Sequence, residues 1–133
     1  MGFTDQNARL NQLKGVANAY FAALTKRDVS SVPWADNIVL RSPLAPQGLD
    51  VPLTGRAAVV GWFETLYPVL GEAKVIEHYF SEDLTSIATR ADVGITDPPS
   101  VLRVVDRFTV DADGRITAQE NHYDPRPALA PIV

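Results

Sequence analysis

A carboxylate interrupts an apolar strand face in the last third of the chain. The segment Val101–Val110 alternates between apolar and polar side chains, and Asp106 falls on the apolar face. The other members of that face are Leu102, Val104, Phe108 and Val110. Burying a lone carboxylate is costly, so we expect Asp106 either to have a raised pKa or to find a hydrogen-bond donor. The alternatives are a structural Asp bonded to a buried backbone or Arg group, and an interface residue.

Tyr20 and His78 are two further candidates for acid–base chemistry. Tyr20 lies on the apolar face of the first predicted helix, where its ring can pack while its hydroxyl reaches a polar pocket. His78 shares a predicted strand face with Ile76 and Phe80, and an imidazole pKa of about 6.5 suits a general base near neutral pH. A core tyrosine and a hydrogen-bonded core or edge histidine are the structural alternatives. The two histidines lack metal-ligand spacing, so no metal is expected.

Two amphipathic helices are predicted in the first half of the chain. Apolar side chains recur at steps of three and four from Leu10 to Leu24, and Thr4 or Asp5 can cap the start of this helix. The further elements expected here are a helical turn over 28–32, a strand over 38–42, a loop over 44–52 and a second helix capped by Thr54 and ended by Pro68 and Gly71.

The second half changes to a period of two, which is typical of strands. Strands are predicted over 74–80, 85–95, 101–110 and 115–123, with turns at 97–100 and 111–114. Helices followed by hairpins indicate an α+β fold. We expect a strongly curved, mostly antiparallel sheet that wraps around the two helices as a cone-shaped barrel, in a single domain over residues 1–133.

Composition excludes several classes of protein. The chain has no cysteine, so disulfides, thiolate metal sites and a Cys nucleophile are ruled out. Its net charge is −4, and no basic stripe is present, which argues against nucleic acid as a partner. No apolar run approaches the ~18 residues of a membrane span, and Met1–Gln6 lacks the features of a signal peptide. We therefore expect a cytoplasmic domain that does not bind membranes.

Five short strings carry a resemblance to a known family. They are Ala19–Leu24, Asp36-Asn37 leading to Ser42-Pro43, Leu53–Ala58, Val105–Phe108 and Asp113–Ile116. They resemble the SnoaL-like and ketosteroid-isomerase-like group of the nuclear transport factor 2 superfamily, over roughly Val16 to Tyr123. By this resemblance Asp106 matches the carboxylic acid that ketosteroid isomerase keeps protonated in its oxyanion hole. Tyr20 matches the tyrosine that donates a hydrogen bond to the developing oxyanion.

The catalytic base of the family does not carry over. Its position falls on Ser42, which cannot move a proton between carbons at neutral pH without a partner. His78 is one candidate for that step, and Asp106 itself, as in a cyclase-like variant, is the other. The resemblance also implies a pocket lined partly by the last strand. The candidate substrate-binding residues are Trp34, Ser42, Phe63, Tyr67, Phe108, Gln119, Asn121 and Tyr123.

A second constellation on this fold belongs to limonene-epoxide-hydrolase-like enzymes, which use an Arg-x-Asp strand and a second Asp on the last strand. Arg90-Ala91-Asp92 resembles the first part, and the second Asp falls on Asn121. The alternation of the strand places Thr89 and Ala91 on the apolar face, so Arg90 and Asp92 are expected to point outward as an ion pair.

The sequence therefore predicts a small apolar pocket that holds a hydrophobic, carbonyl-containing molecule. Cofactor-free acid–base catalysis by Tyr20, Asp106 and His78, of the isomerase, cyclase or dehydratase type, is the first hypothesis. Epoxide hydrolysis and non-catalytic binding of a small ligand are the alternatives. The resemblance also implies a homodimer through the open sheet face, where Arg103, Arg107 and Thr109 suit a polar interface.

Overall fold

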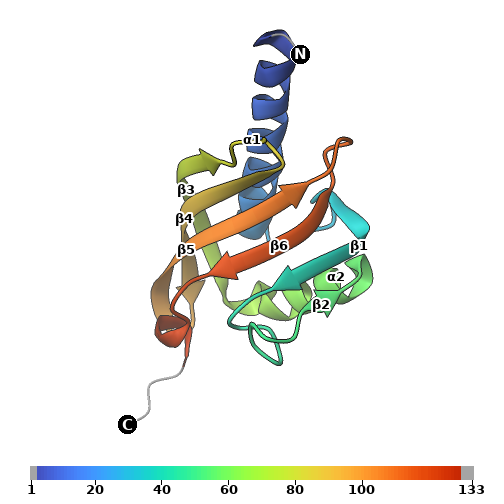
Figure 1. The fold of residues 1–133 in the computed structure, drawn as a ribbon. Coiled ribbons are helices and arrows are strands. Elements are labelled where there is room, and N and C mark those ends of the chain that lie inside the picture. Colours follow the sequence, from blue (N-terminus) through green and yellow to red (C-terminus); the bar gives the residue numbers. More distant parts are fainter. Residues whose placement is uncertain (1–2, 130–133) are drawn as a thin grey trace.

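Two helices lie on one side of a curved sheet in the computed structural model, which describes residues 3–129 and the side chains of 5–129 (Figure 1). The elements are α1 (Phe3–Lys26), β1 (Trp34–Arg41), β2 (Leu53–Thr54), α2 (Arg56–Leu66), the 3₁₀ helix η1 (Tyr67–Val69), β3 (Leu70–Phe80), β4 (Ser86–Thr96), β5 (Pro99–Val110), β6 (Ile116–His122) and the 3₁₀ helix η2 (Arg126–Ala128). Residues 1–2 and 130–133 of the predicted domain lie outside the described residues. No helix within the described range is long and apolar enough to cross a bilayer.

The α+β prediction is confirmed, but the sheet does not close into a barrel. Its six strands follow the order β2-β1-β6-β5-β4-β3, which leaves β2 and β3 as open edges. All neighbouring pairs are antiparallel except β1 and β6, which run parallel. Helix α1 packs mainly against β3, and α2 packs against β1. The strands therefore curve around the helices without joining at their ends.

Several predicted boundaries are wrong. Strand β1 begins at Trp34 because the Ile116 amide of β6 donates to the Pro33 carbonyl at 2.7 Å, a parallel contact distant in sequence. Residues 28–32 form a hydrogen-bonded turn without a helix. Thr4 and Asp5 lie inside α1, so neither is its cap.

The start of α2 also differs from the prediction. Thr54 belongs to the short strand β2, where it pairs with Val39. Gly55 occupies the cap position with φ of +92°, a backbone conformation that glycine adopts without steric cost, and no side chain caps the helix. The Gly55 amide donates to the Ile38 carbonyl at 2.8 Å, which fixes α2 against β1.

A bulge in β3 removes Ile76 from the face on which His78 lies. The register with β4 shifts between Val75 and Glu77, and the side chain of Ile76 is 51% exposed. His78 and Phe80 remain on the inner face, so the prediction that His78 shares that face with Ile76 is wrong. A bulge inserts one residue that faces neither partner properly, and strict alternation cannot anticipate it.

Arg9 fixes α1 against the sheet. Its guanidinium donates to the carbonyls of Leu84, Val110 and Asp111 at 2.7–2.9 Å. These carbonyls belong to the β3–β4 connection and to the start of the β5–β6 turn, so one side chain ties the helix to two connections. Tyr20 lies further along the same helix.

An aromatic cluster around Tyr20 forms the centre of the core. The Tyr20 ring makes edge contacts with the rings of Phe21, Trp34, Phe63 and Phe108, with centroids 4.8–6.2 Å apart. Phe108 is completely buried. Edge-to-face pairs of this kind add stability beyond burial alone. The position of the Tyr20 hydroxyl therefore depends on packing around its ring.

Phe108→Ala is expected to lower the free energy of unfolding by about 3–5 kcal/mol, because it leaves a cavity beneath Tyr20. Urea denaturation measures this loss. Val105→Ala, on the outer face of the same strand, is the control and should change the free energy by no more than about 0.5 kcal/mol. Equal losses in the two variants would contradict the assignment of Phe108 to the core.

Candidate active site

The strand register places three buried polar side chains side by side on the inner face. Asp106 of β5 stands opposite Thr89 of β4 and opposite Asn121 of β6. Their exposed fractions are 2%, 0% and 3%. Directly opposite residues on neighbouring strands have Cβ atoms about 4.5–5.5 Å apart, so these side chains are immediate neighbours. His78 of β3 stands opposite Thr89 and extends the row.

A cavity of about 230 Å³ opens in front of Asp106. It is lined by Tyr20, Leu24, Leu44, Trp62, Phe63, Leu66, Val69, Leu70, Val93, Ile95, Leu102, Val104, Asp106, Asn121, Tyr123 and Ala128. Its polar side chains, apart from the Trp62 indole, are Tyr20, Asp106, Asn121 and Tyr123, and the remainder are apolar. Such a lining suits a hydrophobic ligand with one oxygen-bearing end.

The Asp106 carboxyl is buried without a partner. Among the described residues its Oδ1 has no hydrogen-bond partner, and no Lys or Arg lines the cavity. Burial disfavours the charged form and is the cause that raises the pKa of Asp106 well above its ordinary value. The raised pKa favours a protonated carboxyl in the folded protein.

Tyr20 also stays neutral in this environment. Burial is the largest cause that raises the pKa of Tyr20 well above its ordinary value, and the nearby Asp106 charge adds to it. The Gln119 and Asn121 amides act in the opposite direction. A neutral phenol keeps its proton and can donate it in a hydrogen bond to a ligand oxygen.

A chain of hydrogen bonds fixes the orientation of the Asn121 amide. The Trp34 indole N–H can only donate, and it donates to Gln119 Oε1 at 2.9 Å. Gln119 must therefore use its Nε2 to donate to Asn121 Oδ1, at 3.0 Å. The Asn121 oxygen is thus occupied, and its Nδ2 remains as the free end of the amide. Asn121 Nδ2 is therefore a hydrogen-bond donor for the cavity, and the Trp34 indole behind the cavity wall sets its direction.

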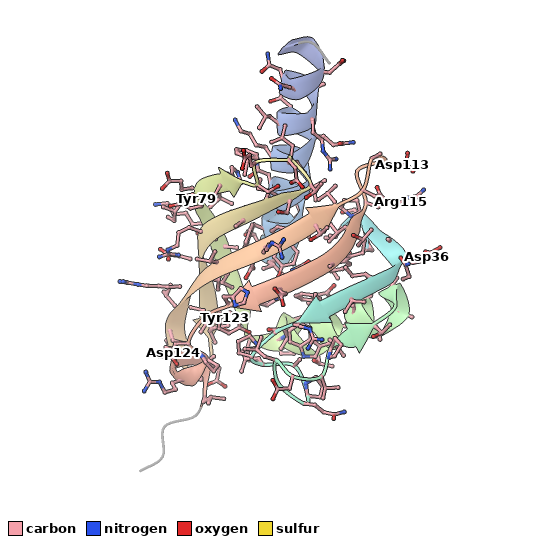
Figure 2. All side chains as sticks on the ribbon, viewed as in Figure 1. Asp36, Tyr79, Asp113, Arg115, Tyr123 and Asp124 are labelled. Atoms are coloured by element: carbon pink, nitrogen blue, oxygen red, sulfur yellow. The ribbon has the colours of Figure 1, made fainter. Side chains whose placement is uncertain are left out.

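Ser42 and Tyr123 form a second polar pair. Their hydroxyl oxygens are 2.8 Å apart. Burial raises the pKa of Tyr123 to about 12, an effect that the Ser42 hydroxyl partly offsets. Tyr123 follows the last residue of β6, at the end of the hairpin opposite the turn with Asp113 and Arg115 (Figure 2). The position where the family resemblance places a base therefore holds a neutral hydrogen bond.

The structure separates the predicted site residues into two groups. The cavity is lined by Tyr20, Phe63, Asp106, Asn121 and Tyr123. The other predicted residues do not line the cavity. Trp34 and Gln119 orient Asn121, and Ser42 contacts Tyr123. Tyr67 accepts a hydrogen bond from the Val29 amide, Phe108 lies in the core, and His78 contacts Thr89 and Asn18.

Sequence analysis missed several lining residues. Leu44 and Ala128 come from a loop and from η2, where no periodic pattern exists. Trp62 and Leu66 are apolar residues at helical spacing in α2, and that spacing could have identified them as lining residues. Thr89 was assigned to the apolar face of its strand, but only the cross-strand register reveals that it stands next to Asp106.

Arg90 and Asp92 lie on the face of β4 opposite to Thr89, as predicted. Arg90 Nη2 donates to Asp92 Oδ1 at 2.8 Å, and the two side chains are 27% and 36% exposed. They do not meet Asn121, so the arrangement expected for an epoxide hydrolase is not assembled. Within residues 5–129 no three His, Asp or Glu side chains cluster as metal ligands would.

The comparisons with known proteins agree with this architecture. The family model of the SnoaL-like domain matches residues 17–119. A search of the curated proteins found no match. A Δ5-3-ketosteroid isomerase from Mycobacterium sp. is similar in structure, with a TM-score of 0.73, 19% identity, and coverage of 87% of this chain and 95% of that one.

Two other similar structures have different functions. A computationally designed 17-OHP binder has a TM-score of 0.73 at 18% identity, and the match covers 87% of this chain and 96% of that one. The epoxide hydrolase/cyclase-like enzyme SalBIII, which has a role in pyran ring formation in salinomycin, has a TM-score of 0.72 at 19% identity. The match covers 92% of this chain and 95% of that one. At these identities the likeness concerns the fold alone, because one fold hosts many functions.

The buried Asp106 makes stability depend on pH. Above about pH 3.9 the unfolded chain loses the Asp106 proton, whereas the folded protein keeps it up to its raised pKa. The unfolded state then binds fewer protons, so the free energy of unfolding falls as pH rises through this window. Asp106→Asn removes the effect and should be more stable than the wild type at pH 8, with the difference shrinking towards pH 4.

Urea denaturation across this range measures the difference. Asp92→Asn, on the outer face, is the matched control and should follow the wild-type pH dependence. An Asp106→Asn curve parallel to the wild-type curve would contradict a raised pKa.

Trp34→Phe tests the orientation of the Asn121 amide. Loss of the indole donor leaves Gln119 Oε1 buried without a partner, which should cost about 1–3 kcal/mol of stability. The amide pair can then rotate, so binding of naphthol, a small aromatic probe with one hydroxyl, should weaken. Calorimetry measures the affinity. Ile87→Val, a fully buried change outside the cavity lining, controls for lost stability. Unchanged naphthol affinity in Trp34→Phe would refute the role of this hydrogen-bond chain.

Proposed function

The chain belongs to the SnoaL-like domain family, and we propose that it is a cofactor-free enzyme that moves a proton within a small, hydrophobic, carbonyl-containing molecule. The observation that carries this proposal is the unpartnered Asp106 carboxyl in the wall of an apolar cavity. An active site is where a strongly shifted carboxyl is useful, since a general base works best with a pKa near the operating pH.

Asp106 serves both as base and as acid in this proposal. No other carboxylate and no imidazole lines the cavity in the described part of the chain. The Asp106 carboxylate removes a proton from the carbon next to the substrate carbonyl, and an enol-like intermediate forms. The same carboxyl then returns the proton to another atom of the same molecule. Return to a distal carbon gives isomerisation, and return to a leaving hydroxyl gives dehydration.

The neutral donors around Asp106 stabilise the enol-like intermediate. The Tyr20 hydroxyl and the Asn121 Nδ2 are both held by buried contacts, and Tyr123 offers a third polar group. Donors that are already oriented towards developing charge need no reorganisation during the reaction, and one such donor is worth roughly 10²–10³ in kcat. The substrate oxygen is therefore placed at the Tyr20–Asn121 end of the cavity.

The cavity also limits the substrate class. Its volume of about 230 Å³ lies below the roughly 300–1,000 Å³ of pockets that enclose drug-sized ligands. At about 30 Å³ for each water-sized group, it encloses roughly eight non-hydrogen atoms, about one ring with its oxygen. No cationic side chain lines it. These features favour a neutral ketone of one or two rings, polar at one end.

Non-catalytic binding of the same kind of molecule is the second candidate. The observation that favours it is the Ser42–Tyr123 pair, which occupies the family position of the base with two neutral hydroxyls. A binding protein needs oriented donors and an apolar wall but no proton carrier. The two candidates differ in a single property, turnover.

Isomerisation of a six-membered β,γ-unsaturated ketone to its conjugated isomer tests the proposal, because ultraviolet absorbance follows the product directly. We expect the wild type to accelerate this reaction, with a rate that rises as pH approaches the pKa of Asp106. Asp106→Asn should abolish it, since an amide cannot carry the proton. Tyr20→Phe should lower kcat by roughly 10²–10³.

Asp92→Asn again provides the matched control and should turn over like the wild type. Full activity in Asp106→Asn would rule out the proposed role of this carboxyl. If naphthol binds the wild type while neither this ketone nor a β-hydroxy ketone reacts, the protein is a binder of small ligands.

A further inference from the structure

His78 and Thr89 continue the row of polar side chains beyond Asp106. His78 stands opposite Thr89, and Thr89 stands opposite Asp106, so all three lie in one line across β3, β4 and β5. Neither His78 nor Thr89 lines the cavity. Thr89 is fully buried, whereas the contact between His78 and Asn18 of α1 lies at the surface. The row thus runs from the cavity wall to solvent on the α1 side of the fold.

The hydrogen bonds give this row a direction. His78 Nε2 lies 3.1 Å from Asn18 Oδ1, and a carbonyl oxygen can only accept, so Nε2 carries the proton of the neutral imidazole. His78 Nδ1 is then an acceptor, and the Thr89 hydroxyl donates to it at 2.9 Å. The lone pairs of the Thr89 oxygen remain free to accept a proton from the Asp106 carboxyl.

We propose that Thr89 and His78 form a proton relay that connects Asp106 to solvent without passing through the mouth of the cavity. The proposal rests on the role of Asp106 as proton carrier. The Asp106 O–H bond breaks as its proton moves to Thr89 Oγ1, and the Thr89 proton moves to His78 Nδ1. The imidazolium releases its Nε2 proton to water, and the reverse sequence reloads the carboxyl.

The position of Asp106 allows this contact to form. Its Oδ1 is buried and has no partner in the structure, and the Thr89 hydroxyl occupies the directly opposite position on β4. Opposite Cβ atoms are about 4.5–5.5 Å apart, so rotation of the carboxyl towards β4 brings it to hydrogen-bond distance. A ligand that fills the cavity blocks the mouth but leaves this side of Asp106 open.

The groups that face the relay suit proton transfer in both directions. His78 is faced by Lys14 and Asn18 from α1 and by Thr89 from β4, and burial together with Lys14 lowers its pKa. Burial raises the pKa of Asp106. The two pKa values therefore shift towards each other from their ordinary values. The neighbours of His78 on its own strand, Glu77 and Tyr79, bond to each other on the outer face.

Paired NMR titrations of the full chain test the relay without any substrate. The resonances are the Asp106 carboxyl carbon and the His78 imidazole, with naphthol in the cavity. Because the Thr89 hydroxyl bonds to His78 and, in the relay, also to Asp106, protonation of one group changes the hydrogen bond offered to the other, so each resonance should show both titration steps in the wild type. Thr89→Val removes the hydroxyl but keeps both titratable groups in place, and it should leave each resonance with its own step alone.

Two variants exclude a purely structural effect. Thr89→Ser keeps the hydroxyl and should restore the shared titration, and Thr109→Val, the same change on the outer face of β5, should leave it intact. Shared steps that persist in Thr89→Val would overturn the relay, because the coupling would then act through space. If Thr89→Val does not fold, Thr89→Ala replaces it: loss of the second Asp106 step supports the relay, and its persistence overturns it.

This outcome is separate from that of the proposed function. If Asp106 and His78 titrate together but no ketone is turned over, the proposed catalytic function is refuted and the relay is not. If ketone is turned over but the two groups titrate independently, the relay alone is refuted. During turnover of the unsaturated ketone in D₂O, the relay predicts that the fraction of product carrying deuterium falls in Thr89→Val relative to Thr109→Val.

Discussion

The desolvation of one carboxyl governs the rest of this structure. Asp106 is 2% exposed and has no hydrogen bond to its Oδ1, so the folded protein favours the neutral acid. A buried ionised carboxylate would need a cation nearby, and none lines the cavity. The surrounding polar groups are correspondingly neutral: two phenols, an amide and a hydroxyl. The same absence of charge that lets the fold tolerate Asp106 makes the cavity suitable for an uncharged, hydrophobic molecule.

Rigid packing turns these neutral groups into oriented donors. Tyr20 is held by four aromatic rings, and the Asn121 amide is held by Gln119, which is held in turn by the Trp34 indole. Because an indole N–H can only donate, the direction of the whole chain follows from Trp34. Residues behind the cavity wall therefore control the chemistry of its surface. The solved structures of this fold include an isomerase and a designed binder, so the fold by itself does not decide between these functions.

His78 illustrates how an inner-face residue can matter without reaching the cavity. The bulge at Ile76 keeps its ring on the inner face, but α1 and Thr89 separate it from the cavity. A direct role as base on the substrate is thereby disfavoured, and Asp106 is left as the one carboxyl among the described residues that line the cavity. The position occupied by Ser42 strengthens this conclusion, because its hydroxyl is engaged with Tyr123.

The sequence alone determined the order of the two long helices and of β1, β3, β4, β5 and β6, the inward faces of α1, β4 and β5, and the placement of Tyr20 and Asp106 on those faces, because local periodicity records which side chains are buried. It also determined the family, since the strings that carry the resemblance, such as Asp113–Ile116, lie within the residues that the family model matches. Only the tertiary structure decided the open sheet, the parallel contact between β1 and β6 and the bulge in β3. It likewise decided that Thr89, Asp106 and Asn121 form one row and that Trp34 and Phe108 lie behind the cavity wall. These features depend on strand register and on contacts between residues far apart in the chain, and local periodicity carries no information about either.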